Sequence, residues 1–352
     1  MAHGLVNFSA FSVEDFYHPT LLFIYRIFWE VFLIITTVFF VFILYVILKN
    51  SKDIGEYKYF MINQLVWSYL FNLLASAWKP VPLWPFYMGF GAGWFRSWKG
   101  IWAVLPFYTE IAIGVGMGVS IFMSAMHRYI YMFPTSQFAK HYESLTFKLL
   151  FYGFVLIIIE CGAIIPISLF YVDREVLRES ITSKYPFMDF FFENEPSIFG
   201  YDPALNNQLS VLYAFLILIF LIGIIIFAFL MYLNFIRLMK KNKHTVSQIT
   251  HQMQMILFKT LFVQLLLVLV FLLIPLLLAL FFTAFGIRWT SFLTLVGIMF
   301  CSFHPLADFV ALIYFIKPYR IFVLNIFRKP NNGMQPQNFI ASTSAVSTPQ
   351  QS

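Results

Sequence analysis

Seven long apolar stretches constrain the fold more than any other feature of this sequence. They cover about residues 23–48, 59–78, 101–126, 147–171, 209–236, 256–285 and 290–316. A helix rises about 1.5 Å per residue and the hydrocarbon layer is about 30 Å thick, so each stretch is long enough to cross a bilayer. Strands with open edges would leave backbone polar groups unsatisfied in lipid. The sequence therefore predicts an all-α bundle of seven transmembrane helices.

The composition supports this fold class and excludes several functions. Only 11% of the residues are charged, whereas soluble domains average about a quarter, and the mean hydropathy is +0.80. The two cysteines, Cys161 and Cys301, both lie inside apolar stretches, which excludes a disulfide scaffold. The sequence contains no zinc spacing, phosphate-binding loop, dinucleotide fingerprint or serine-hydrolase elbow. We therefore expect no enzyme and no cofactor.

The distribution of lysine and arginine predicts the orientation in the membrane. With the N-terminus outside, fourteen basic residues fall on the inner side and seven on the outer side, and positive charge favours the inner side. Asn7, Phe8 and Ser9 form a glycosylation sequon that would then face outward. The net charge of +7 thus marks the inner leaflet and not nucleic acid. We expect an extracellular segment at 1–22, the bundle at 23–328 and a disordered cytoplasmic tail at 329–352.

The connection at residues 172–207 is the one sizeable outer segment in this topology. It is rich in Asp and Glu, and it also carries many Phe and Tyr residues. Two interpretations stand at this point. The aromatic residues favour a folded lid over the bundle, whereas the acidic residues favour a solvated loop that discourages misinsertion.

Polar residues within the apolar stretches are expected to face the bundle interior, because an ionisable group in lipid is costly. Glu110 lies well inside the third stretch, either as an anchor in a ligand pocket or as a structural hydrogen-bonding group. The pattern favours interhelical hydrogen bonds for four others: Asn63, Gln64, Asn72 and Glu160. His304 and Asp308 stand one helical turn apart, and the absence of a third ligand favours a polar pair over a metal site.

Local spacing gives three further expectations. Arg26 and Glu30 are four residues apart and are predicted to pair with each other. Gly114 and Gly118 are predicted to let the third helix pack closely against a neighbour. Arg128 closes the third stretch, either as a bridge to neighbouring helices or as a basic residue that extends toward lipid headgroups.

The sixth stretch combines a polar start with a long apolar run. The polar part begins at Ser247, and the apolar part is interrupted by Gln264 and Pro275. Proline lacks a backbone donor and crowds the preceding turn, so this helix is predicted to bend near Pro275. A bent helix that begins with polar residues is typical of a helix that moves to transmit a change across the membrane.

Motifs in the third, sixth and seventh stretches together indicate a family. The chain resembles the nematode serpentine chemoreceptors, G-protein-coupled receptors of the superfamily that contains classes H, I and Str. The sixth-span signature is carried by Ser247, Thr250, Gln254, Leu257, Leu261, Gln264 and Pro275, with Val268 where the family usually has a second proline. The other motifs are His127 and Arg128 closing the third span, and His304, Pro305, Asp308, Tyr319 and Arg320 in and after the seventh. Unlike rhodopsin-like receptors, the chain has no cysteine near the outer end of its third span.

The resemblance implies a receptor of class H or I that binds a small external chemical and activates a heterotrimeric G protein. It implies a location in the plasma membrane of sensory cilia. Ligand-binding roles fall to Glu110, Trp67 and Tyr108. Coupling roles fall to His127, Arg128, Lys240, Lys241, Lys243, Tyr319 and Arg320, and switch roles to Gln264, Pro275, Pro305 and Asp308.

Three other classes of membrane protein remain open from the sequence. A non-signalling scaffold or an odorant-receptor-like channel fits the composition, but channels of that type place the N-terminus inside, against the distribution of lysine and arginine. A transporter of a small solute would need paired broken helices, and the sixth stretch alone is plainly interrupted. An intramembrane enzyme would need a convergent catalytic set, for which His304 and Asp308 are the sole candidates. The expected partners are a small-molecule ligand, a G protein and membrane lipid.

Overall fold

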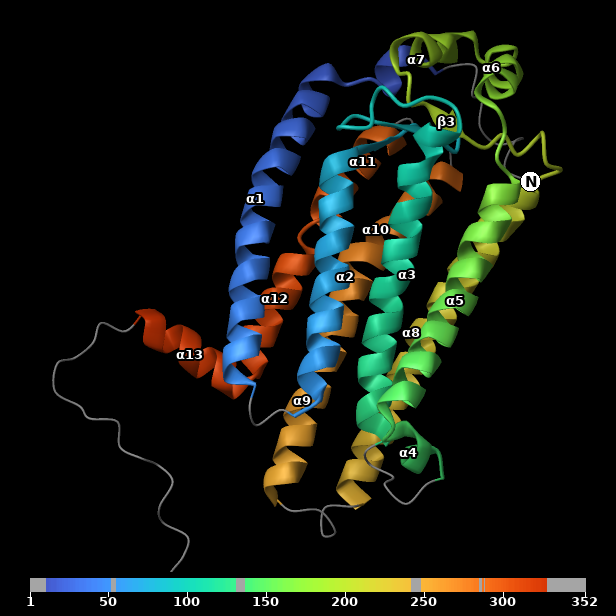
Figure 1. The fold of residues 1–352 in the computed structure, drawn as a ribbon. Coiled ribbons are helices and arrows are strands. Elements are labelled where there is room, and N and C mark those ends of the chain that lie inside the picture. The colour runs from blue at the N-terminus through green and yellow to red at the C-terminus, as the bar shows by residue number, and fades with distance from the viewer. Residues whose placement is uncertain are drawn as a thin grey trace, which may run out of the picture.

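Long helices packed side by side form the body of the protein in its computed structural model (Figure 1). The structure describes residues 11–51, 55–130, 137–241, 248–284, 287 and 289–327. Within them, seven long helical segments correspond to the seven apolar stretches, so the predicted all-α bundle is confirmed. These segments are α1 (Pro19–Asn50), α2 (Tyr57–Trp78), α3 (Ile101–Ile130), α5 (Leu145–Leu169), α8 (Leu209–Lys241), α9 (Gln248–Val268) continued by α10 (Ile274–Ala284), and α11 (Thr290–Cys301) followed by α12 (His304–Phe315).

Six of the described segments are long and apolar enough to cross a membrane, and α2 is the seventh member of the bundle. The lower hydropathy of α2 comes from a buried polar face made of Gln64, Ser68, Asn72 and Ser76. This helix lies between α1 and α3 (Figure 1) and packs against both. Its polar side chains are thereby kept away from lipid, so they can hydrogen-bond to neighbouring helices.

Proline residues set the interruptions in the last two spans. A π-helical turn, η6 (Leu269–Leu273), lies directly before Pro275, whose ring would crowd the carbonyl of Phe271 in a regular α-helix. The seventh stretch was predicted as one span but is divided at Ser302 and Phe303. Pro305 has no backbone N–H and would crowd the carbonyl of Cys301, which explains why α11 ends there.

A small folded layer covers one end of the bundle, which we call the lid end. It contains the antiparallel strands β1 (Pro80–Pro82), β2 (Met88–Gly91) and β3 (Phe199–Gly200), in that order, and η3 (Val13–Asp15) near the N-terminus. It also contains α6 (Arg174–Thr182), η5 (Pro186–Met188) and α7 (Asp189–Asn194). Gly91 is required here, because an added Cβ would lie 2.6 Å from the indole Cδ1 of Trp78.

The lid, residues 172–207, is folded and not a solvated loop, which decides between the two interpretations. Phe191, Phe192 and Met188 are almost fully buried, and they join one hydrophobic core with Phe16 from the N-terminal segment and Phe90 from β2. Asp173 begins α6 by accepting a hydrogen bond from the Glu175 N–H at 3.0 Å. The aromatic residues of this segment therefore form a core, while most of its acidic residues stay at the surface.

The opposite end carries α4 (Gln137–Tyr142) and α13 (Lys317–Phe327), and we call it the basic end (Figure 1). A second hydrophobic core joins α1, α2, α12 and α13 there, with Phe309 and Tyr319 fully buried. Tyr319 fixes the start of α13, because its hydroxyl lies 2.6 Å from the Ser51 hydroxyl after α1. The helix α13 thus begins against the bundle and then points away from it.

Candidate functional site

Helix α3 carries candidate residues from both functional groups predicted from the sequence. Tyr108 and Glu110 lie in its lid-end half, and His127 and Arg128 lie in its last turn at the basic end. The helix packs against α2, α5 and α9. A shift of α3 at its lid end would therefore change its packing against several helices.

Glu110 lies in the lid-end half of the bundle with an incompletely satisfied carboxylate. Its Oε2 atom is buried and has no hydrogen-bond partner among the described residues. It lies within electrostatic reach of Tyr25 on α1, whose own hydroxyl donates to the Pro80 carbonyl oxygen at 2.7 Å. No ion pair joins Glu110 to a described basic residue. A buried carboxylate oxygen without a donor is available to a donor from outside the chain.

Tyr108 and Trp67, the two other predicted ligand residues, contact different parts of the molecule. The Tyr201 hydroxyl, at the end of the lid, donates to the Tyr108 hydroxyl at 3.3 Å. Trp67 donates from Nε1 to the Tyr152 hydroxyl of α5 at 2.9 Å. Tyr108 is therefore linked to the lid, whereas Trp67 faces α5 in the middle of the bundle. Among the described residues, no hydrogen bond joins Trp67 to Glu110.

The lid is fastened by charged groups that satisfy one another. Arg96 donates to both carboxylate oxygens of Glu195, at 2.8 and 2.9 Å, and the Glu195 side chain is only 3% exposed. This hydrogen bonding raises the pKa of Arg96 above its ordinary value. Ser180 and Lys184 donate to Asp202 at 2.6 and 3.3 Å. Although burial opposes it, the donors around Asp202 lower the pKa of its carboxyl.

At the basic end, Arg128 is buried against an aromatic ring. Its guanidinium carbon lies 3.8 Å from the ring centroid of Tyr57 on α2, and the residue is 3% exposed. Its Nε and Nη1 atoms have no hydrogen-bond partner, and no carboxylate forms an ion pair with it, among the described residues. Tyr57 therefore stabilises this buried charge, through cation–π attraction to its ring and a hydrogen bond to its hydroxyl. Of the two interpretations from the sequence, a bridge to a neighbouring helix is the one observed.

A ring of aromatic and charged groups surrounds Arg128. His127 packs on Phe60, with ring centroids 4.3 Å apart. Nearby, Lys148 of α5 donates to Glu56, which precedes α2, at 2.5 Å. That hydrogen bond lowers the pKa of Glu56. The ring contact joins α3 to α2, and the ion pair joins α5 to the start of α2.

Asp308 lies in the bundle interior on α12 and is 1% exposed. Gln64 of α2 donates to its Oδ2 atom at 3.5 Å, and Gln264 of α9 also hydrogen-bonds to it. Its Oδ1 atom has no partner among the described residues. Three spans therefore meet at one buried carboxylate. No cluster of three or more metal-ligating residues occurs in the described part of the chain.

A comparison with family models identifies the chain. Residues 22–329 match the serpentine type 7TM GPCR chemoreceptor Srh. The chain belongs to this family. A search of curated proteins gave no match. The predicted resemblance to nematode serpentine chemoreceptors is thereby confirmed, and Srh corresponds to class H. The Srh receptor is thus an integral membrane protein and a chemosensory G-protein-coupled receptor.

The other predicted site residues of the Srh receptor lie at the basic end, at the interruptions of the last two spans, or outside the described residues. Lys240 is exposed on α8, and Arg320 is exposed on α13, where it donates to the Tyr314 carbonyl oxygen at 3.2 Å. Pro275 follows the π-turn of the sixth span, and Pro305 opens α12 beside buried His304. The side chain of Lys241, and Lys243 and Asn7 as a whole, lie outside the described residues.

Two local predictions for the Srh receptor are wrong, and both fail for the same reason. Glu30 does not pair with Arg26 but with Lys79, a residue that follows α2 in left-handed conformation. Gly114 and Gly118 are not the point of close helix packing, since a Cβ on Gly118 would meet nothing within 4 Å. Gly116 is that point, because an added Cβ would lie 2.5 Å from the Trp67 ring. Spacing within one helix cannot reveal a partner on another element.

Sequence reasoning found most interhelical polar contacts but missed the partner of Arg128. Asn63 donates to the Tyr152 hydroxyl at 3.3 Å and Asn72 to the Thr36 hydroxyl at 2.8 Å, so both, like Gln64, make the predicted bonds between helices. Glu160 makes none with the described residues. Tyr57 was not singled out, because it precedes the predicted second stretch, 59–78; it is the first residue of α2, at the basic end, beside the last turn of α3.

Proposed function

We propose that this Srh receptor binds a small external chemical at its lid end and activates a heterotrimeric G protein at its basic end. The family supports chemoreception, and the excess of lysine and arginine supports an outside N-terminus. The receptor then resides in the plasma membrane of sensory cilia. Its lid faces the surroundings of the cell, and its basic end faces the cytosol.

The ligand site in this proposal lies beneath the lid and includes Glu110, Tyr108 and Trp67. Glu110 provides a carboxylate oxygen that is buried and unpaired within the described chain, so it selects a ligand with a hydrogen-bond donor or a positive charge. Tyr108 reports to the lid through Tyr201, and Trp67 reports to α5 through Tyr152. Ligand contact at these residues would therefore bias helices that are not themselves in contact with Glu110.

The observation that carries the proposal is the state of Arg128. Arg128 is a buried cation that stacks on the Tyr57 ring, and no described carboxylate neutralises it. Such a charge favours any rearrangement that returns it to water or brings it a carboxylate. Separation of α2 and α3 at the basic end would release Arg128 from Tyr57 and present it, with His127, to a G protein. Lys240, Lys241, Lys243, Tyr319 and Arg320 complete the proposed coupling surface.

The switch in this proposal runs through the interrupted helices. Asp308 joins α2, α9 and α12, and the interruptions before Pro275 and at Pro305 allow the sixth and seventh spans to change their bend. A ligand needs only a difference of a few kcal/mol in its affinity for two arrangements to shift their populations. The π-turn η6 is the most suitable hinge, because its wider turn already departs from the α-helical bond pattern.

A chemical panel applied to cells that express the receptor with a promiscuous G protein tests this function. Panel members with a donor or cationic group should evoke a response, and Glu110→Gln should weaken that response at unchanged surface expression. Thr109→Val is the matched control, since Thr109 is exposed and its hydroxyl donates only to the Leu105 carbonyl oxygen. Equal loss of surface expression and response in Glu110→Gln would assign Glu110 a structural role. Uptake of panel members into vesicles without G-protein activation would favour the transporter alternative.

A further inference from the structure

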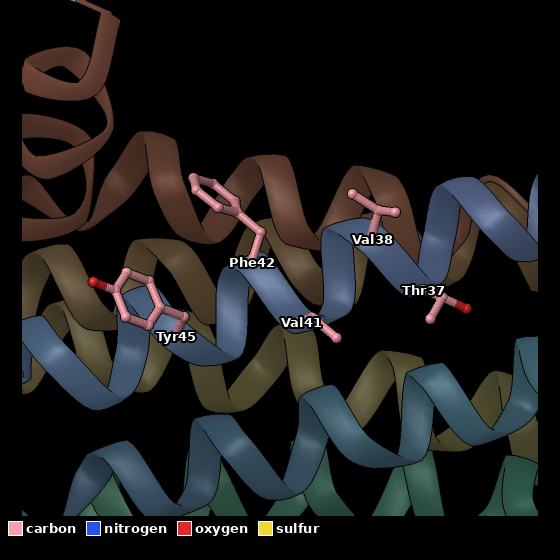
Figure 2. A pocket seen from close by; sticks show the side chains of 5 residues that line it. All are labelled: Thr37, Val38, Val41, Phe42 and Tyr45. Atoms are coloured by element: carbon pink, nitrogen blue, oxygen red, sulfur yellow. The ribbon is translucent and has the colours of Figure 1, made fainter.

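A groove of about 520 Å³ runs along the outward face of α1, away from the sites described above. Figure 2 shows its lining, which comes from five residues on successive turns of this one helix: Thr37, Val38, Val41, Phe42 and Tyr45. Val38, Val41 and Tyr45 are at least half exposed, so the groove opens to the surroundings of the bundle. In an integral membrane protein such a groove faces lipid acyl chains.

One end of this groove carries a positive charge that is held in place. Lys49 donates from Nζ to the Tyr45 hydroxyl at 2.8 Å. The same Nζ lies 5.2 Å from the Tyr45 ring centroid and 5.4 Å from that of Phe322 on α13. None of the carboxylates in the described residues forms an ion pair with Lys49. A lysine that only extends toward water would turn away from apolar surface, whereas this amine is folded back onto two rings.

We propose that this groove binds one anionic phospholipid. An acyl chain would lie along Val38 and Val41, and the phosphate would accept charge-assisted hydrogen bonds from Lys49 and the Tyr45 hydroxyl. The charge is complementary, because one end of the groove carries a cation that no described carboxylate pairs with, and the rest of its length is apolar. In the proposed orientation Lys49 lies at the cytosolic leaflet, where anionic lipids gather. The binding itself depends only on the groove and not on G-protein activation.

A lipid in this position would also act on α13. Phe322 is in contact with both Tyr45 and Lys49, with a ring-centroid separation of 6.1 Å from Tyr45. A headgroup on Lys49 therefore lies next to the junction between α1 and α13. Its presence would stabilise α13 in the observed position against the bundle, next to the Tyr319–Ser51 hydrogen bond.

Native mass spectrometry of the purified full-length receptor tests the proposal, with phosphatidylserine as probe and phosphatidylcholine as the neutral comparison. One phosphatidylserine should bind in preference to phosphatidylcholine. Lys49→Gln should weaken that binding about fivefold, which corresponds to about 1 kcal/mol for one basic residue at the surface. Val41→Trp should fill the groove and reduce phosphatidylserine binding while Lys49 remains.

Two control variants separate this site from general effects of charge and surface. Lys58→Gln removes another lysine of the basic end, one that lies 5.1 Å from the Tyr59 ring centroid and outside the groove. Val31→Trp enlarges a valine of α1 that is 51% exposed and also outside the groove. Both controls should bind phosphatidylserine like the unmodified receptor. Equal binding of the two lipids, no effect of Lys49→Gln, or equal losses in Lys49→Gln and Lys58→Gln would overturn the proposal. The lipid-binding result does not depend on G-protein activation, so a receptor that fails to activate a G protein should still bind phosphatidylserine.

Discussion

The lid and the contact between α2 and α3 at the basic end hold a buried charged group in opposite ways. At the lid end, the buried carboxylate of Glu195 receives two hydrogen bonds from Arg96. At the basic end, Arg128 is buried against Tyr57 and forms no ion pair with any described residue. A paired charge can be kept in one arrangement, whereas an unpaired buried charge raises the free energy of the arrangement that holds it. The difference teaches that the lid is a fixed scaffold and that the contact between α2 and α3 at Arg128 is poised to rearrange.

The largest expected effect tests the scaffold. Arg96→Gln leaves the buried carboxylate of Glu195 without its charged donor and should lower the free energy of lid opening by about 3 kcal/mol. Arg178→Gln should lower it far less, because the carboxylates that Arg178 contacts, Asp189 and Glu193, are 41% and 64% exposed. Hydrogen exchange of the amides in α7 measures both. Equal effects would show that the buried Arg96–Glu195 pair stabilises the lid no more than the exposed contacts of Arg178 do.

The next effect tests the poised end. Tyr57→Leu removes the ring that stabilises Arg128 and should cost the resting arrangement about 2 kcal/mol, or roughly thirtyfold in its population relative to the active one. Basal G-protein activation should rise accordingly. Tyr57→Phe keeps the ring and loses only the hydroxyl, so it should raise basal activation much less than Tyr57→Leu. If both variants raise basal activity alike, the hydroxyl and not the ring holds Arg128.

A smaller effect tests the packing between the two ends. Gly116→Ala would place a Cβ 2.5 Å from the Trp67 ring and should destabilise the receptor by about 1 to 2 kcal/mol. Gly118→Ala lies on the same helix with nothing within 4 Å of the added Cβ, so it should be neutral or slightly stabilising. Thermal unfolding in detergent compares the two. A loss at Gly118 as large as that at Gly116 would contradict the assigned contact.

The smallest effect concerns acidity at the lid end. Burial by itself would raise the pKa of Asp202. Hydrogen bonds from Ser180 and Lys184 outweigh burial and hold this pKa below its ordinary value of 3.8 in the folded state. A lowered folded-state pKa stabilises the lid above the unfolded-state pKa, and this stabilisation is lost as the pH falls through the folded-state value. Exchange in the lid should therefore increase below about pH 4, by less than about 1 kcal/mol. Asp202→Asn should remove this part of the pH dependence; an unchanged profile would assign it to other groups.

The sequence predicted the helices well because burial in lipid leaves a long apolar stretch few alternatives to a helix. It also identified Asn63, Gln64 and Asn72 as interhelical groups, since a polar side chain inside a span needs a partner. It could not predict that Glu30 pairs with Lys79, that Gly116 meets Trp67, or that Arg128 stacks on Tyr57. Each of these depends on the rotation and height of one element relative to another, which residue spacing within one helix does not encode.

The most direct test of the account is the G-protein response of Arg128→Ala at surface expression equal to that of the unmodified receptor. The account predicts that this variant reaches the surface, binds an active member of the chemical panel and fails to activate the G protein. Arg128→Lys keeps a charge but loses the planar group that stacks on Tyr57, so it should retain only part of the response. A normal ligand-evoked response from Arg128→Ala would contradict the coupling role of Arg128 and the poised state of the basic end.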